Sequence, residues 1–160
     1  MKSLTHEELG RLVLAAGADG LMFRVMFNHG LRVSEVIALT DANVVDGHLV
    51  VQRLKGSRKT TQPLLADEQE LLTMKGRFFP MSRWTVRRRM QELSVPTGIA
   101  QHLLHPHVLK HTCGRLGYKG GMGVPDIVAY LGHVNAGNSL KYMESTEGEA
   151  AAAFAAAVGK

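Results

Sequence analysis

The sequence predicts a mainly helical α+β domain that contains one small three-stranded antiparallel sheet. Three observations predict this fold class. Apolar residues recur at helical spacing near the N-terminus and again through most of the second half of the chain. A strand–turn–strand pattern is confined to residues 43–65. The chain has 160 residues, 45% of them hydrophobic, which is enough for a single domain with an ordinary core.

The first helix is predicted to begin after Thr5, because this residue type suits an N-cap and Glu8 follows in the first turn. Its apolar positions recur until Gly17 ends the segment. A second, mostly buried helix is predicted over residues 20–29. Glycine at position 30 breaks it, and a short helix resumes over residues 33–39.

The sheet is predicted from two valine-rich runs, residues 43–45 and 48–52, joined by a tight turn at Asp46 and Gly47. A basic turn over residues 55–59 leads into a third strand from Thr60 that ends at Pro63. Later apolar patterns predict helices over residues 67–74, 82–93, 107–117, 125–131, 139–143 and 147–158.

Composition excludes several classes of protein. No apolar stretch is long enough to span a membrane, and the first 20 residues lack the apolar block of a signal peptide. Cys113 is the only cysteine, so neither an intramolecular disulfide nor a cysteine-rich zinc site is possible, and a cytoplasmic location is expected. Nineteen Lys and Arg against fourteen Asp and Glu give a net charge of +5, which is compatible with a nucleic-acid partner.

Two basic residues stand at positions where the chain turns. Arg32 follows the break between two apolar helices, and it is either a structural cation paired with Glu35 or a phosphate ligand. Lys55 occupies the predicted turn between strands, beside Arg58 and Lys59. This turn is either a solvated hairpin tip or a mobile loop that places a cation beside a phosphate.

Four histidines cluster at positions 102, 105, 107 and 111. A metal site is not expected, because no Cys, Asp or Glu lies between Gln101 and Thr112 to complete one. Pro106 suits a helix start, and from there His107 and Lys110 point the same way one turn apart.

His133 follows an apolar helix, and Tyr142 comes nine residues later in a short helix where packing is the ordinary role of a tyrosine. Another helix is strongly basic, and it is either a solvated face or a surface that lies along a DNA backbone. It carries Trp84 together with Arg83, Arg87, Arg88 and Arg89.

Together these segments resemble the catalytic domain of the tyrosine recombinases, the phage integrase family. GLRVSE at residues 30–35 is similar to the family's first box, G-L-R-x-S-E. Lys55 through Leu64 resembles its β-hairpin lysine segment. PHVLKHT at residues 106–112 is similar to P-H-D-L-R-H-T, and LGH at residues 131–133 with Tyr142 is similar to the closing box. The four boxes stand in the family's order, and the similarity covers the chain from about Thr5 to Met143.

The resemblance implies a site-specific DNA recombinase, or integrase, with a role for each matched residue. Arg32 is expected to clamp the scissile phosphate, and Lys55 to protonate the leaving 5′ oxygen. His107 and His133 are expected to support phosphate binding and proton transfer. Tyr142 is expected to attack the phosphorus and form a 3′-phosphotyrosyl intermediate.

Glu35 and His111 are expected to support the site. The partner is double-stranded DNA, bound by a tetramer that assembles from monomers. Neither ATP nor a metal is expected, because the phosphotyrosine conserves the bond energy. The side chains expected to contact DNA are Arg58, Lys59, Arg83, Arg87 and Arg88.

Two residues depart from the family's pattern. Lys110 stands where the family has arginine, and Val108 stands where it has aspartate. Lysine keeps the charge but lacks the planar fork that grips two phosphate oxygens, so a working but slower site is expected. A type IB topoisomerase-like enzyme and a DNA-binding relic with crippled cleavage are the alternatives.

The resemblance also bears on domain organisation. Residues 1–160 are expected to form one catalytic domain of bacterial, phage or mobile-element origin, without the core-binding domain that usually precedes it. An excised fragment is favoured over a naturally minimal recombinase. The alanine-rich tail, residues 147–158, is expected to dock on a neighbouring protomer, with packing on its own domain as the alternative.

Overall fold

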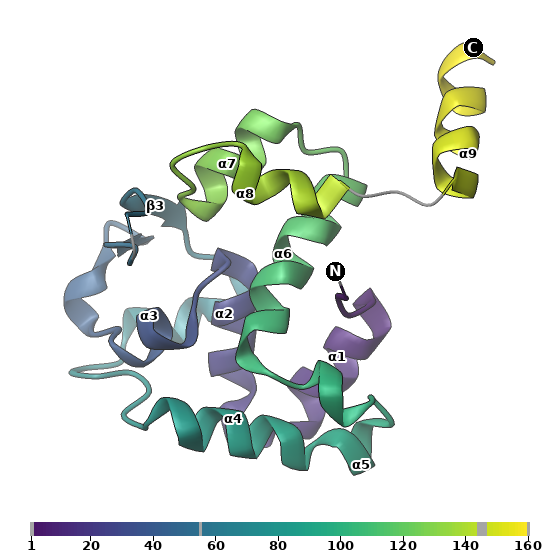
Figure 1. Cartoon of the computed structure of the whole chain (residues 1–160). Coiled ribbons are helices and arrows are strands. Elements are labelled where there is room, and N and C mark those ends of the chain that lie inside the picture. The colour runs from purple at the N-terminus through teal and green to yellow at the C-terminus, as the bar shows by residue number, and fades with distance from the viewer. Residues whose placement is uncertain (1, 55, 144–146, 160) are drawn as a thin grey trace.

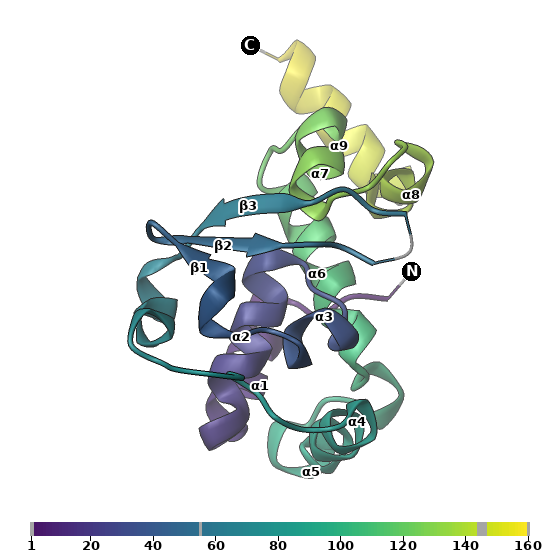
Figure 2. The ribbon, with the colours of Figure 1, turned by 90° about the vertical axis from the view of Figure 1, so that its left-hand side faces the viewer.

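The computed structural model describes residues 2–54, 56–143 and 147–159. A small sheet lies on one side of the helices, with α6 running through the middle of the molecule and α4 and α5 at the end opposite α7 (Figures 1 and 2). The helices are α1 (His6–Ala15), α2 (Gly20–His29), α3 (Val33–Ile37), α4 (Arg83–Glu92), α5 (Ser94–Thr97), α6 (Pro106–Lys119), α7 (Val124–Leu131), α8 (Gly137–Leu140) and α9 (Glu147–Val158). The strands are β1 (Val44–Val45), β2 (His48–Val51) and β3 (Thr60–Pro63). Short 3₁₀ turns are η1 (Gly17–Asp19), η2 (Asp41–Asn43), η3 (Ala66–Leu72), η4 (Gln101–Leu103) and η5 (Lys141–Met143).

The N-terminal helix begins where its cap predicts. Thr5 Oγ1 accepts from the Glu8 amide (3.1 Å), and Glu8 Oε2 accepts in return from the Thr5 amide (2.8 Å). This reciprocal pair satisfies two N–H groups that the first turn leaves unpaired. The helix then buries Leu9 and Leu12 against the rest of the domain.

The turn between α2 and α3 depends on glycine. Gly30 has φ +60°, a left-handed conformation, and a Cβ at this position would collide with Leu131. The chain therefore leaves α2 abruptly, and Arg32 becomes the residue that precedes the first turn of α3. The predicted break is confirmed, and it places Arg32 at the end of a rigid, buried helix.

The predicted three-stranded antiparallel sheet is confirmed, with strand order β1-β2-β3. The β1–β2 turn has positive φ at both Asp46 (49°) and Gly47 (72°), as a two-residue hairpin turn requires. In β2, Leu49 and Val51 point into the core while His48 is exposed. The β2–β3 pairing begins with Val51 opposite Thr60, so residues 52–59 form the connecting loop.

Two of the predicted helices differ from the structure. Residues 66–72 form the 3₁₀ turn η3 instead of an α-helix. In this turn the Glu68 carboxylate is buried, accepts from the Leu65 amide (2.9 Å) and pairs with His29. The single helix predicted over residues 139–143 is α8 followed by η5. Helix α5 and turn η4 were not predicted, since their four and three residues are too short to show a period.

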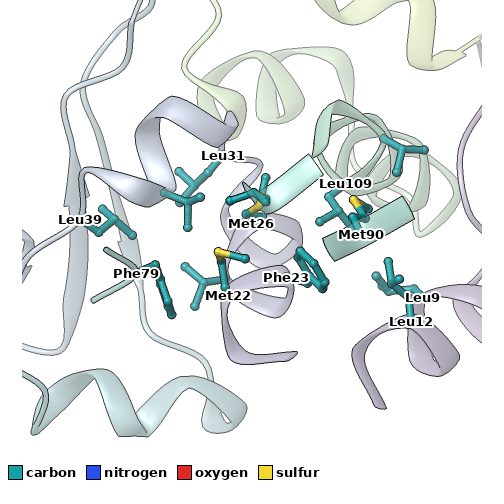
Figure 3. Close-up of a cluster of buried hydrophobic side chains, with 14 of the residues drawn as sticks. Leu9, Leu12, Met22, Phe23, Met26, Leu31, Leu39, Phe79, Met90 and Leu109 are labelled. Atoms are coloured by element: carbon teal, nitrogen blue, oxygen red, sulfur yellow. The ribbon is translucent and has the colours of Figure 1, made fainter. Parts of the chain in front are cut away.

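The main core lies between α1, α2, α4 and α6 and continues beneath the sheet (Figure 3). Met22, Phe23 and Met26 of α2 occupy its centre, with Met90 of α4 and Leu109 of α6 beside them. A second buried cluster is formed by Ile127, Leu131 and Tyr142. The first cluster fixes α6, and the second holds the chain after α7 against it.

Helix α9 extends away from the rest of the molecule (Figures 1 and 2). Residues 148–158 are all exposed, including Phe154 at 68%. At its first turn, Glu149 pairs with Arg115 (3.3 Å) and Lys119 (3.7 Å) of α6. No helix in the described part of the chain combines the length and apolar character that crossing a bilayer demands.

Candidate functional site

Arg32 is both anchored and accessible. Its Nη1 donates to Glu35 Oε1 (3.2 Å), to the Leu54 carbonyl (3.3 Å) and to Ser57 Oγ (3.4 Å). The side chain keeps 23% of its surface exposed. The pairing with Glu35 considered from sequence is therefore present, and it leaves the guanidinium within reach of an anion.

Glu35 holds this corner of the molecule together. The carboxylate is buried and accepts from the Arg32 amide (2.8 Å), from the Leu54 amide (3.2 Å) and from Arg53 Nη1 (3.2 Å). Burial opposes the charge of Glu35, but these hydrogen bonds and the Arg53 charge outweigh it and hold the pKa of Glu35 below its ordinary value. Glu35 therefore stays ionised and orients Arg32 from behind.

Arg53 is the principal residue that the sequence analysis missed. It is 3% exposed, and besides Glu35 it donates to the Gly30 carbonyl (3.0 Å), the His29 carbonyl (2.7 Å) and Thr60 Oγ1 (2.8 Å). These bonds join the base of the β2–β3 loop to the end of α2. A signal was present, because residue 53 continues the inward alternation of Leu49 and Val51.

A second buried polar network lies behind the sheet. His29 Nε2 pairs with Glu68 Oε2 (2.8 Å), and His29 Nδ1 lies 2.7 Å from Gln62 Oε1. Gln62 in turn donates to the Tyr130 carbonyl of α7 (2.6 Å). The network thereby ties β3 to α7, the helix that immediately precedes His133.

Lys110 is the buried cation of the site. It is 2% exposed, and among the described residues its Nζ has no hydrogen-bond partner. Burial, followed by repulsion from Arg32 and Arg53, lowers the pKa of Lys110 to about 8. An unpaired buried ammonium has a strong electrostatic demand for an anion.

Two histidines of α6 lie beside Lys110. The His107 and His111 rings are 4.4 Å apart between centroids and nearly perpendicular. His107 is exposed, whereas His111 is half-buried. Burial lowers both imidazole pKa values, that of His111 to about 3 with help from the His107 charge. With a pKa of about 3, the His111 ring is neutral near pH 7.

Tyr142, which comes late in the sequence, packs beside the histidines of the site. Its ring stacks on His133 (6.3 Å between centroids, 14° between planes) and lies 6.0 Å from His111. Tyr142 is 1% exposed, and its hydroxyl has no partner in the described part of the chain. Burial raises the pKa of Tyr142 to about 12, with a smaller contribution from Cys113.

His133 is held by its neighbour. Its Nδ1 lies 2.7 Å from Ser139 Oγ, and burial followed by the Lys110 charge lowers the pKa of His133 to about 4. The Gly132 carbonyl, one residue earlier, accepts from the Arg58 amide (2.8 Å). The turn that carries His133 is thus attached to the β2–β3 loop.

A groove of about 890 Å³ runs along this side of the molecule. Arg32 and His107 belong to its lining, whereas Lys110, His133 and Tyr142 are buried and do not line it. The other basic or aromatic side chains in its lining are Arg83, Trp84, Arg87, His102 and His105.

The remaining predicted DNA contacts are distributed unevenly. Arg83 and Arg87 line the groove, and the Arg83 guanidinium lies 5.5 Å from the centre of the exposed Trp84 ring. Arg88 is outside the groove lining and pairs with Glu92 (2.9 Å). Arg58 and Lys59 are exposed on the β2–β3 loop. Lys55 lies outside the described residues, and within them no three His, Cys, Asp or Glu side chains gather as a metal site.

Comparisons with known proteins agree with the resemblance read from the four boxes. The family model described as the phage integrase family matches residues 2–149. The type 1 fimbriae regulatory protein FimE of Escherichia coli K12 is 30% identical over 153 residues, covering 82% of this chain and 77% of FimE. FimB of the same strain is 28% identical over 173 residues, covering 91% of this chain and 85% of FimB. Tyrosine recombinase XerA of Saccharolobus solfataricus is 27% identical over 125 residues, or 72% of this chain and 42% of XerA.

Solved structures confirm the fold. The crystal structure of a XerA recombinase has a TM-score of 0.78 at 21% identity, and the alignment covers 99% of this chain and 65% of that one. The catalytic domain of bacteriophage HP1 integrase has a TM-score of 0.73 at 22% identity, over 96% of this chain and 95% of that domain. The family model and the similarity to FimE favour the recombinase interpretation over the topoisomerase-like alternative. The chain belongs to the phage integrase family of site-specific tyrosine recombinases.

Proposed function

We propose that this chain cuts and rejoins DNA through a covalent step in which the Tyr142 oxygen attacks the scissile phosphorus. The observation that carries the proposal is the convergence of cationic and imidazole side chains on one tyrosine. His111 and His133 lie 6.0 and 6.3 Å from its ring, and the positive charge of Arg32 acts on its phenol. These groups come from α6, from the end of α7 and from the α2–α3 turn.

The chemistry requires such a set. In-line attack on a phosphodiester builds negative charge on the non-bridging oxygens, and fixed cations stabilise that charge. Arg32, supported by Glu35, presents N–H groups suited to two oxygens, while Lys110 supplies a single buried charge. His107 is exposed in the groove and is placed to donate or accept hydrogen bonds at the phosphate.

The covalent step also moves two protons. As the Tyr142 oxygen bonds to phosphorus, its proton passes to a neutral acceptor, and His133 fits because its pKa of about 4 leaves the imidazole unprotonated near pH 7. The bond from phosphorus to the 5′ oxygen breaks, and that oxygen takes a proton from Lys55, a role assigned through the family resemblance. Rejoining reverses both transfers.

A trapping experiment tests the proposal. A library of random duplexes with bridging 5′-phosphorothiolate linkages gives irreversible cleavage, because the released thiol does not attack the phosphotyrosine. Covalent adducts are isolated, their DNA is sequenced to define a selected duplex, and the attached peptide is mapped by mass spectrometry. We expect the DNA on Tyr142. Attachment to another residue, or binding without any adduct, contradicts the proposal.

We also propose that the groove binds double-stranded DNA. XerH, a site-specific recombinase with a TM-score of 0.77 to this chain, has been solved bound to its difH substrate. In this chain Arg83 and Arg87 line the same groove as Arg32 and His107. A DNA backbone lying there meets cations along its path toward the proposed site of attack.

Arg87 and Arg88 offer a matched test of this surface, because they are neighbours on α4 and only Arg87 lines the groove. Arg87→Ala is expected to weaken binding of the selected duplex and to reduce the slope of log K against log salt by about 0.9. Arg88→Ala is expected to leave the slope unchanged. Fluorescence anisotropy over a KCl series measures both, and equal effects of the two changes reject the groove.

We propose that α9 docks on a neighbouring protomer when four chains assemble on DNA. The exposure of residues 148–158, Phe154 included, supports docking in trans over packing on its own domain. Removing residues 148–160 is expected to prevent assembly on paired duplexes, measured by native mass spectrometry, while adducts still form on single duplexes. Normal assembly of the shortened chain rules out the docking role.

A further inference from the structure

Gly114 lies where α6 meets the ring of Tyr142. A Cβ at this position would lie 2.7 Å from Tyr142 Cδ2 and 2.8 Å from both Cε2 and Cγ. Such distances are not tolerated between a Cβ and a rigid ring, so an alanine here requires the ring to move. Glycine in the interior of a helix also lowers helix stability relative to alanine. The close approach of the ring accounts for a glycine at this unfavourable position.

In this position against Gly114, which we call the seat of the ring, Tyr142 is buried and does not line the groove. The ring belongs to the apolar cluster with Ile127 and Leu131, and only 1% of the residue is exposed. The side chains that line the groove include Arg32 and His107 but not Tyr142. A phosphate bound in the groove therefore does not meet the phenol while the ring remains on this seat.

The Tyr142 hydroxyl forms no hydrogen bond that would offset its burial against Gly114. Among the described residues it has no hydrogen-bond partner, although its own surroundings exclude water. A buried hydroxyl without a partner is unfavourable, so ring packing must hold Tyr142 in place against that penalty. A Cβ that collides with the ring in this position should therefore release it.

We propose that Gly114 is a positioning residue that seats Tyr142 in a withdrawn position, from which the ring must move before it attacks DNA. The inference rests on the proposed function of Tyr142 only for its effect on cleavage; the seat itself is a property of the fold. Gly114→Ala then shifts the equilibrium toward the released ring, and the reactive fraction of the enzyme increases.

Nitration by tetranitromethane measures the seat without DNA. Peptide mapping resolves Tyr142 from Tyr118 and Tyr130, so those two residues serve as internal references. In Gly114→Ala we expect nitration of Tyr142 to be faster by roughly tenfold, since the rate follows the exposed fraction of the ring. Gly10→Ala is the matched control, because Gly10 is also helical and a Cβ there meets nothing within 4 Å. Unchanged nitration of Tyr142 in Gly114→Ala rejects the seat.

Single-turnover cleavage of the selected duplex tests the second part of the proposal, the effect of the seat on the cleavage rate. We expect the Gly114→Ala rate to rise several-fold over wild type, because more of the protein has a released ring. Faster nitration with slower cleavage would show that the seat is the productive position and overturn the withdrawn state. If Tyr142 is not the nucleophile, Tyr142→Phe still cleaves while the nitration result stands, so the two failures are distinguishable.

A double-mutant cycle of Tm values distinguishes a specific clash with Tyr142 from a general loss of stability. Gly114→Ala is expected to lower Tm when Tyr142 is present and to raise it in a Tyr142→Ala background, where the Cβ no longer meets the ring and the helix gains an alanine. Gly10→Ala is expected to raise Tm in both backgrounds. An equal loss of Tm from Gly114→Ala in both backgrounds means that Tyr142 does not occupy the space, and the inference fails.

Discussion

Tyr142→Phe is expected to abolish covalent attachment of DNA and to lower the single-turnover cleavage rate by roughly 10⁴-fold or more, because no other group supplies the attacking oxygen. The protein should otherwise remain intact. Phenylalanine keeps the ring on Gly114 and beside His133 and removes only a buried hydroxyl without a described partner. Tm is therefore expected to stay the same or to increase slightly.

Three measurements separate this outcome from an indirect one. Adduct formation on the selected duplex gives the cleavage rate, anisotropy gives DNA affinity, and thermal denaturation gives Tm. Affinity should be close to that of wild type, since the hydroxyl is buried in the unbound protein. Tyr118→Phe is the control, because Tyr118 packs at the edge of the same apolar cluster. Residual cleavage by Tyr142→Phe within tenfold of wild type contradicts the proposed nucleophile.

Lys110→Arg is expected to change how cleavage depends on pH. With a pKa of about 8, Lys110 is charged near pH 7 and loses its proton as the pH rises. The protonated fraction falls by roughly 30-fold between about pH 7 and about pH 9.5, and a rate that needs this cation falls with it. Arginine keeps its charge throughout that range, so the decline should disappear.

The phosphorothiolate duplex suits this comparison, because its thiol leaving group needs little protonation and the general acid drops out of the profile. The other side chains of the site are the same in both proteins, so the ratio of the two rates isolates residue 110. Lys110→Met removes the charge at every pH and should be slow throughout. A wild-type rate that stays level from pH 7 to pH 9.5 argues against Lys110 as the cation at the phosphate.

Local signals in the sequence predicted the parts of the fold that are built from neighbours in the chain. Thr5 and Glu8 cap each other within one turn, and Asp46 and Gly47 form their turn alone. Gly30 was predicted to end its helix because glycine readily adopts the left-handed backbone conformation that terminates helices. The positions of Arg32, His133 and Tyr142 were predicted from short segments that resemble the boxes of the family.

The parts that were missed depend on contacts between distant segments. Arg53 becomes structural only when α2 supplies two carbonyl groups to its guanidinium. Glu68 is buried in η3 because it pairs with His29, which is remote in sequence. Neither the burial of Lys110 nor the seat of Tyr142 on Gly114 has a local signature, since each is decided by what packs against α6.

The hydrogen bond from the Arg58 amide to the Gly132 carbonyl joins the β2–β3 loop to the end of α7. Arg58 and Lys59 are exposed on a loop that DNA is proposed to touch, whereas Gly132 immediately precedes His133. A Cβ at Gly132 would lie 2.7 Å from the Arg58 carbonyl oxygen, so the two segments are in close backbone contact. The position of the backbone that leads to His133 is therefore set in part by the β2–β3 loop, through a main-chain contact that involves neither side chain.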